Sequence, residues 1–317
     1  MELREEILAR LALLTHAAWE EGLPPVLSRI AFNRLTASGA LENLVLRRNA
    51  MVDDTRYERV CLLLSRVGRI EKELEAMEES GYRILLPQQA LWPDGLRRLD
   101  KAMPQFLVMR GNSDLLRQSR IAVAGSRDIL ANTRRLAQET GRRIAQEGFV
   151  MICGGARGVD DAAQEACLAA GGSLILVPAQ PVSVLLSRHA YLRTALDGGR
   201  LLVLCDTLPQ EPFSAHKALS RNHTIYALGD AAVVVASRLE QGGSWRGAMD
   251  CIKGGYTPVY TFDMPWTDMQ GNHALRDCGA AYLNPALPLG SQIHTKREEQ
   301  LSFLNKDSVE AERGNQT

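Results

Sequence analysis

The sequence predicts an α/β fold, in which a parallel β-sheet is covered by helices on both faces, with a small helical domain before it. From residue 121 onward, short apolar runs alternate with amphipathic stretches. The runs are apolar throughout, as expected for strands that are buried on both faces of a sheet. Alternation of strands and helices is typical of parallel sheets that are built from strand–helix–strand units.

Residues 1–78 are expected to form a helical accessory domain. Apolar residues recur at spacings of three and four along the first helix, from Leu3 to Leu14. A Gly-Leu-Pro-Pro stretch at residues 22–25 ends that helix, and further helices are expected near residues 26–37 and 56–79. Such helices could also bind a DNA backbone, although the balanced charge of the chain gives this little support.

Residues 79–288 are expected to form the α/β domain. Its strands are predicted at residues 106–109, 121–124, 150–153, 174–177, 201–204, 231–236 and 258–261. Its helices are predicted at residues 132–147, 159–170, 185–196, 220–227 and 244–253. Right-handed crossovers would bring the carboxyl ends of the strands to one edge of the sheet, where ligands bind in such folds. The domain is therefore expected to be Rossmann-like.

Composition sets the class of protein. The 317 residues carry 37 basic and 37 acidic side chains, so any nucleic-acid binding must come from a local patch. No apolar run approaches ~20 residues and the first residues are charged, so neither a membrane span nor a signal peptide is expected. The six cysteines form no CxxC pair, so no metal site is predicted and a cytoplasmic location is expected. Residues 289–317 are polar and are predicted to form a poorly ordered tail.

The first candidate site follows the predicted strand 121–124. Gly125 lets the backbone approach a ligand closely, and Ser126 can donate its hydroxyl. Arg127 can bind a phosphate with two hydrogen bonds, and the amides at the start of the next helix can hold an anion. A strand-to-helix turn without a ligand also favours glycine and serine.

The second candidate site is a glycine-rich turn between the strand 150–153 and the next helix. Its predicted phosphate-binding residues are Gly154, Gly155, Arg157 and Gly158. The turn is neither the dinucleotide fingerprint nor a P-loop, because no G-x-G-x-x-G and no Gly-Lys-Ser/Thr is present. Asp160 is expected to cap the helix that follows.

Two further candidate sites lie later in the chain. Arg221 and Asn222 precede the strand 231–236 and could contact a phosphate or a base, or simply begin a solvated helix. The last turn and the helix after it supply Gly243, Ser244, Arg246 and Lys253. Ser244 is expected to be the N-cap, and the two basic residues are seven apart and share a helix face.

These turns, in this order, resemble the motifs of the DprA/Smf (DNA-processing) family over about residues 90–262. The stretch Gly-Gly-Ala-Arg-Gly-Val-Asp at residues 154–160 is the most specific part. The resemblance implies an extended Rossmann fold that binds single-stranded DNA, with Arg127, Arg157 and Arg221 on the phosphates. It also implies a homodimer that loads a RecA-type recombinase. The chain departs from the family pattern at Gln164 and His223, where the family usually has a histidine and an arginine.

Three functions fit these features. The first is a single-stranded DNA-binding protein that assists recombination or DNA uptake. The alternative is a nucleotide-binding sensor module related to the LOG phosphoribohydrolases, without hydrolase activity because no glutamate matches their loop. The third is a scaffold whose N-terminal helices bind a partner protein. No Ser-His-Asp elbow, carboxylate pair or H-E-x-x-H motif is present, so neither enzymatic activity nor a cofactor is expected.

Overall fold

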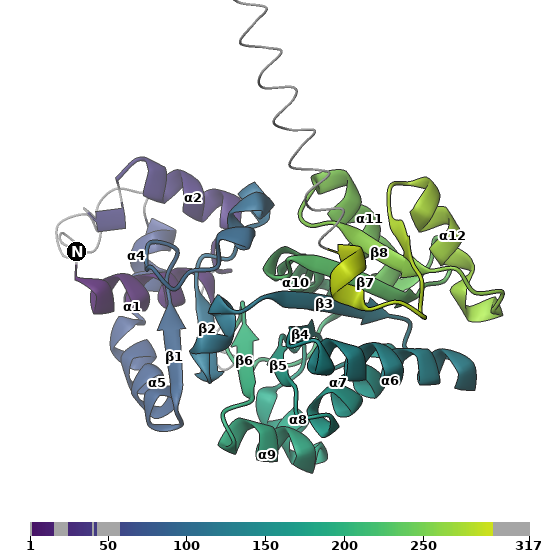
Figure 1. The fold of residues 1–317 in the computed structure, drawn as a ribbon. Coiled ribbons are helices and arrows are strands. Elements are labelled where there is room, and N and C mark those ends of the chain that lie inside the picture. Colours follow the sequence, from purple (N-terminus) through teal and green to yellow (C-terminus); the bar gives the residue numbers. More distant parts are fainter. Residues whose placement is uncertain (1, 16–24, 40, 43–57, 294–317) are drawn as a thin grey trace, which may run out of the picture. The chain divides into compact units, whose positions relative to one another are not determined.

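The computed structural model describes residues 2–15, 25–39, 41–42 and 58–293 (Figure 1). By their internal contacts, the residues group into two compact units. Unit 1 contains Met1–Arg117 and Ile175–Thr224, and unit 2 contains Gln118–Leu174 and Ile225–Thr317. Most of the predicted break at residues 22–25 and most of the predicted tail lie outside the described residues. The division at residues 78 and 288 stays a prediction.

Unit 1 combines the N-terminal helices with part of the sheet. Its helices are α1 (Leu3–Leu14), α2 (Arg29–Ala37), α4 (Glu58–Leu64), α5 (Val67–Glu79), α8 (Val182–Arg188), α9 (Ala190–Asp197) and most of α10 (Ala215–Leu228), with short 3₁₀ turns η1 (Asp94–Ala102) and η2 (Ser113–Arg117). Its strands are β1 (Tyr82–Leu85), β2 (Leu107–Gly111), β6 (Leu201–Cys205) and the end of β5 (Ser173–Leu176), in the order β1-β2-β6-β5.

A buried arginine fastens α1 to the segment before β2. Two nitrogens of Arg10 donate to the Glu6 carboxylate, at 2.9 and 2.6 Å. A third donates to the backbone carbonyl of Gln105, at 3.0 Å. Because Arg10 is only 8% exposed, breaking this pairing would leave a buried charge without a partner, so the contact holds α1 against the segment before β2.

Unit 2 holds the parallel strands that carry most of the candidate site. Its strands are β3 (Arg120–Gly125), β4 (Val150–Cys153), β7 (Ala231–Ala236), β8 (Val259–Phe262) and β9 (Ala281–Leu283), in the order β4-β3-β7-β8-β9. Its helices are α6 (Ala131–Gln146), α7 (Val159–Ala169), α11 (Gly242–Gly254) and α12 (Gln270–Asp277), with the 3₁₀ turn η3 (Thr267–Met269). The pairs β3/β4, β3/β7, β7/β8 and β8/β9 are parallel.

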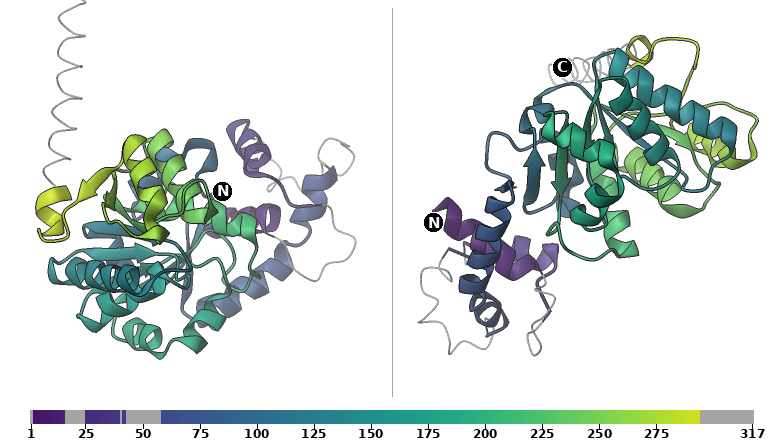
Figure 2. Two further views of the ribbon diagram at one scale, coloured as in Figure 1. Left: turned by 90° about the vertical axis from the view of Figure 1, so that its right-hand side faces the viewer. Right: turned by 90° about the horizontal axis from the view of Figure 1, so that it is seen from below.

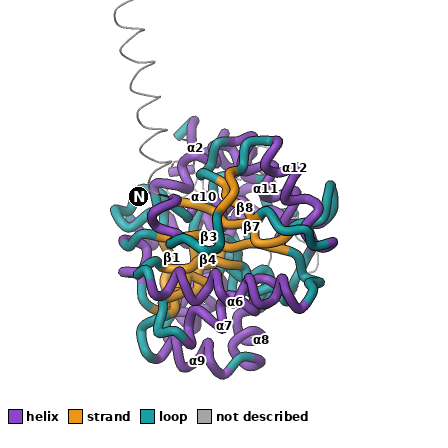
Figure 3. The backbone as a smooth tube through the Cα atoms, turned by 45° about the vertical axis from the view of Figure 1, so that its right-hand side comes forward, coloured by secondary structure: helices purple, strands orange, loops and turns teal. Residues whose placement is uncertain are grey.

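Helices cover both faces of the sheet in unit 2. Figure 1 shows α6 and α7 on one face and α11 and α12 on the other, and the two views of Figure 2 agree. In Figure 3 the strands lie between these helices. Strands β4 and β7 are buried along their whole length, as their apolar sequences predict. The described strands belong to a mostly parallel sheet, so the predicted α/β, Rossmann-like fold is confirmed.

The structure differs from the sequence prediction in several elements. β2 runs antiparallel to both β1 and β6, so the carboxyl ends of the strands do not all meet at one edge. The helix predicted at residues 185–196 is two helices that meet at His189. β1, β9 and α12 are not predicted, because they are short and their side chains are mostly half-exposed or polar.

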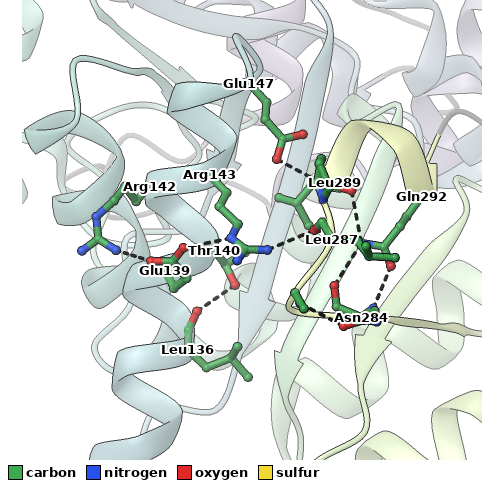
Figure 4. Close-up of polar contacts among 12 residues, drawn as sticks. Leu136, Glu139, Thr140, Arg142, Arg143, Glu147, Asn284, Leu287, Leu289 and Gln292 are labelled. Atoms are coloured by element: carbon green, nitrogen blue, oxygen red, sulfur yellow. Dashed lines mark hydrogen bonds and ion pairs between the residues drawn. The ribbon is translucent and has the colours of Figure 1, made fainter.

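The segment after β9 packs against α6 in unit 2 (Figure 4). Arg143 of α6 donates to the carboxylate of Glu139, at 2.9 Å, and to the carbonyl of Leu287, at 3.0 Å. The hydrogen bond from Arg143 lowers the pKa of the Glu139 carboxyl, so this group stays charged to a more acidic pH than an ordinary glutamate. Arg143 thus joins its own helix to the chain that follows the last strand.

The carboxylate of Glu147, the C-cap residue of α6, holds the same segment. The two oxygens of Glu147 accept the amide hydrogens of Leu289, at 2.9 Å, and Gly290, at 2.7 Å (Figure 4). The hydroxyl of Tyr260 donates to the carbonyl of Ile293, at 3.4 Å. Residues 289–293, the start of the predicted tail, are therefore fastened to unit 2, and residues 294–317 lie outside the described residues.

Candidate nucleic-acid interface

The turn after β3 is built by close packing. A Cβ atom on Gly125 would lie 2.4 Å from the side chain of Val159, so only glycine fits at this position. The amide and the hydroxyl of Ser126 both donate to the carbonyl of Ala236, at 2.9 and 3.3 Å. Both donors of Ser126 are thus used within unit 2, whereas Arg127 is exposed.

The turn after β4 packs directly against the turn after β3. Gly155 and Gly158 have φ angles of 66° and 90°, which favour glycine. A Cβ on Gly158 would lie 2.4 Å from the carbonyl oxygen of Ser126. The amide of Val159 donates to that same oxygen, at 3.2 Å. The glycines predicted to bind phosphate therefore have a packing role, which the sequence alone does not distinguish from ligand binding.

Asp160 does not cap α7 as predicted. The N-cap is Gly158, and Asp160 lies two residues into the helix. Its Oδ2 atom accepts the amide hydrogens of Gly154, at 3.1 Å, and Ala156, at 3.3 Å. Because Asp160 is only 6% exposed, its carboxylate is an internal anion that fixes the glycine turn.

Arg157 projects from this turn into solvent. Its Nη2 atom lies 2.8 Å from a carboxylate oxygen of Asp128, and the two side chains are 74% and 60% exposed. An exposed pair of this kind stabilises a fold by about 0–1 kcal/mol, so a phosphate can displace the carboxylate at little cost. The arginine is therefore available to an anionic ligand.

Ser244 is likewise not an N-cap. The N-cap of α11 is Gln241, and the Ser244 hydroxyl donates to the carbonyl of Gly125, at 2.5 Å. This bond ties the start of α11 to the turn after β3. Arg246 is exposed in the first turns of α11. Lys253 is also exposed but lies near the far end of the helix, about 10 Å along its axis from Arg246.

One basic residue at this edge is missing from the sequence prediction. Arg238 follows β7 by two residues and is exposed. Because β4, β3 and β7 are neighbours and parallel, the turns at their carboxyl ends meet at one edge of unit 2. We call four exposed arginines the arginine edge: Arg127, Arg157 and Arg238, which follow these strands, and Arg246, which lies in the first turns of α11. The position of Arg238 just beyond a wholly apolar run, with only Ser237 between them, was the available signal.

Arg221 and Asn222 belong to unit 1. Both lie inside α10, which begins at Ala215, earlier than predicted. Arg221 is 6% exposed, and Asn222 is half-buried. Arg221 thus differs from the exposed arginines of the arginine edge. The contact of Arg221 and Asn222 with DNA stays a prediction.

The described residues also bear on metal binding and on membrane insertion. In the residues that the structure describes, no group of three or more histidine, cysteine, aspartate or glutamate side chains is arranged to hold a metal ion. Over the same residues, no helix is both long and apolar enough to cross a membrane.

Comparison with known proteins identifies the family. The model of the family described as DNA recombination-mediator protein A matches residues 83–289, well over half of the chain. The chain belongs to this family. The resemblance that the glycine and arginine turns predict is thereby confirmed.

Individual members of the recombination-mediator protein A family show the same relationship. DNA processing protein DprA of Streptococcus pneumoniae is 29% identical over 140 residues, which are 44% of this chain and 49% of that protein. The alignment thus spans about half the length of this relative.

Solved structures share the fold at lower identity. The structure of DprA from Streptococcus pneumoniae has a TM-score of 0.60 and 22% identity, covering 81% of this chain and 95% of that one. A structure of DNA processing protein A from Helicobacter pylori, which concerns its single-stranded DNA binding mode, has a TM-score of 0.55 and 21% identity. It covers 69% of this chain and 96% of that one.

Proposed function

We propose that this protein binds single-stranded DNA with the arginine edge of unit 2 and assists recombination or DNA uptake. The observation that carries the proposal is the set of four exposed arginines, three that follow adjacent parallel strands and one in the first turns of α11. Guanidinium groups bind phosphates with paired, charge-assisted hydrogen bonds. A chain with no net charge needs such a local concentration of positive charge to bind a polyanion.

Membership of the recombination-mediator family supports this function, and the relative from Helicobacter pylori is described as binding single-stranded DNA. The proposal extends to the parts that the family resemblance implies. These are a non-catalytic role in the cytoplasm, a homodimer, and the loading of a RecA-type recombinase onto the bound strand. Arg221 and Asn222 of unit 1 are proposed as further contacts to the strand.

The proposal is tested by titrating labelled oligo-dT with the parent protein and with Arg127→Ala and Arg157→Ala. Each variant should bind about tenfold more weakly, because a charge-assisted hydrogen bond to phosphate contributes roughly 1.5 kcal/mol. Both side chains are exposed, so the variants should keep the parent's thermal unfolding midpoint.

Arg142→Ala is the matched control. Arg142 is also an exposed arginine of unit 2 that is paired with a carboxylate, that of Glu139. It lies about three turns along α6 from the start of that helix, away from the arginine edge. Its removal should leave oligo-dT affinity unchanged. Equal affinity of the parent, Arg127→Ala and Arg157→Ala would show that the strand binds elsewhere.

A further inference from the structure

Internal carboxylates bind the backbone just before the two helices at whose starts a Rossmann-like unit ordinarily binds a phosphate. In such folds the phosphate of a nucleotide sits against the free amides of a helix that follows a parallel strand. In unit 2, α6 follows β3 and α7 follows β4. An aspartate of the protein itself binds the glycine turn that leads into α7, and another binds the N-cap of α6.

At α7 the aspartate is Asp160. Its Oδ2 atom accepts hydrogen bonds from the amides of Gly154 and Ala156, at 3.1 and 3.3 Å. These amides belong to the glycine turn that the sequence predicts to hold a phosphate. A ligand phosphate would have to displace a carboxylate that is only 6% exposed.

At α6 the aspartate is Asp268, which comes from η3 at a far point in the sequence. Its Oδ2 atom accepts from the amide of Leu130, the N-cap residue, at 2.8 Å. Its Oδ1 atom accepts from the hydroxyl of Thr133, at 2.9 Å. Asp268 is 8% exposed, so its charge too is held inside the unit.

We infer that Asp160 closes the glycine turn before α7, and Asp268 the N-cap of α6, to the phosphate of a free mononucleotide, so that the protein takes polymeric DNA only. A buried carboxylate both uses the amide donors and repels a phosphate that approaches them. The groups that can then bind a ligand phosphate are the exposed guanidinium groups of the arginine edge. This inference rests on the proposed function for the class of ligand, a nucleic acid strand.

The arrangement favours a strand over a single nucleotide for a second reason. A mononucleotide offers a single phosphate group to these exposed guanidinium groups, and such a contact is weak by itself because both charges stay largely in solvent. A strand presents several linked phosphates, so each contact after the first is intramolecular and the affinities combine. Asp160 also fixes the turn from which Arg157 projects, so it acts as a positioning residue for that contact.

The test compares AMP with oligo-dT on the parent protein, using amide NMR shifts and calorimetry at the same salt concentration. Oligo-dT should bind and saturate, whereas AMP and inorganic phosphate should give no saturable shift at the amides of Gly154 and Ala156. Saturable AMP binding at these amides overturns the inference and leaves the proposed function intact. Failure of oligo-dT to bind defeats the proposed function while the closure to AMP still stands.

A gain-of-binding variant tests the role of the carboxylate directly. Asp160→Ala removes the carboxylate that accepts from the amides of Gly154 and Ala156. Because these two amides can then donate to a phosphate, the variant should bind AMP at least about tenfold more tightly than the parent. Asp161→Ala is the matched control, since it removes the neighbouring charge without freeing those amides; the Asp161 carboxylate accepts instead from Gln164, at 3.4 Å.

Thermal unfolding checks that Asp160→Ala folds. AMP should raise the unfolding midpoint of this variant and leave that of Asp161→Ala unchanged. If Asp160→Ala does not fold, Asp160→Asn takes its place in the shift experiment. Its amide oxygen still accepts from Gly154 and Ala156, so it should stay closed to AMP. Opening of Asp160→Asn to AMP, or equal AMP affinity of Asp160→Ala and the parent, contradicts occupation of the amides as the cause.

Discussion

The ion pair between Arg157 and Asp128 joins two exposed side chains at the edge of unit 2. The arginine belongs to the proposed DNA contact, and the carboxylate competes with a phosphate for the same guanidinium. An exposed pair contributes little to folding, so the pair affects mainly the balance between the free and the DNA-bound states. Asp128 is therefore expected to weaken the proposed DNA binding.

Asp128→Asn should strengthen oligo-dT binding by about two- to tenfold, because it removes a competing charge and a repulsion. Fluorescence anisotropy at low salt measures the change. Asp277→Asn is the control, since Asp277 is an exposed carboxylate of unit 2 that pairs with Arg276, at 3.6 Å, away from the arginine edge. An equal gain in both variants would mean that net charge alone, and not the freed Arg157, governs binding.

At the level of residues, the sequence predicts which side chains occupy the turns but not their partners. The Ser126 donors face a carbonyl 110 residues away, and the Ser244 hydroxyl faces one 119 residues away. Local sequence indicates that a serine or an aspartate follows a strand, but it does not show which tertiary group the side chain meets. For that reason Ser244 and Asp160 were expected to be helix caps.

At the level of elements, the fully buried strands are the most predictable parts. The predicted bounds of β4 and β7 are those of the structure, because a run of apolar residues ended by glycine or polar residues leaves little choice. β1 carries the exposed Arg83 between half-buried residues, and β9 has only three residues, so neither has a clear periodic signal. The antiparallel direction of β2 depends on its pairing with β6, which lies far along the chain.

Helices α6 and α7 approach each other closely at a glycine. A Cβ on Gly141 of α6 would lie 2.0 Å from the carbonyl oxygen of Ala163 in α7. These helices begin at the turns of Arg127 and Arg157, so their spacing sets the spacing of the two turns.

Gly141→Ala should lower the free energy of unfolding by about 1–3 kcal/mol, because the added methyl group forces the helices apart. Urea denaturation measures the change. Gly68→Ala is the matched control, since a Cβ on Gly68 of α5 meets nothing within 4 Å. It should raise stability by about 0.4–1 kcal/mol. Stabilisation by both substitutions would show that α6 and α7 do not need the glycine contact.

At the level of the whole molecule, the chain is neutral, so its proposed affinity for DNA has to come from where the charges lie. The sequence predicts three of the four arginines of this edge and the parallel strands that bring them together. It does not predict the internal carboxylates Asp160 and Asp268, because their roles depend on contacts made only in the folded chain. The proposed selectivity for polymeric DNA is thus a property of tertiary structure.

The dependence of oligo-dT binding on salt tests the central claim most directly. For single strands, the logarithm of the binding constant falls with the logarithm of salt concentration by about 0.7 per neutralised phosphate. The triple variant Arg127→Ala, Arg157→Ala and Arg246→Ala should therefore show a slope that is shallower than the parent's by about 2. An unchanged slope in the folded triple variant would contradict the claim that these arginines neutralise DNA phosphates.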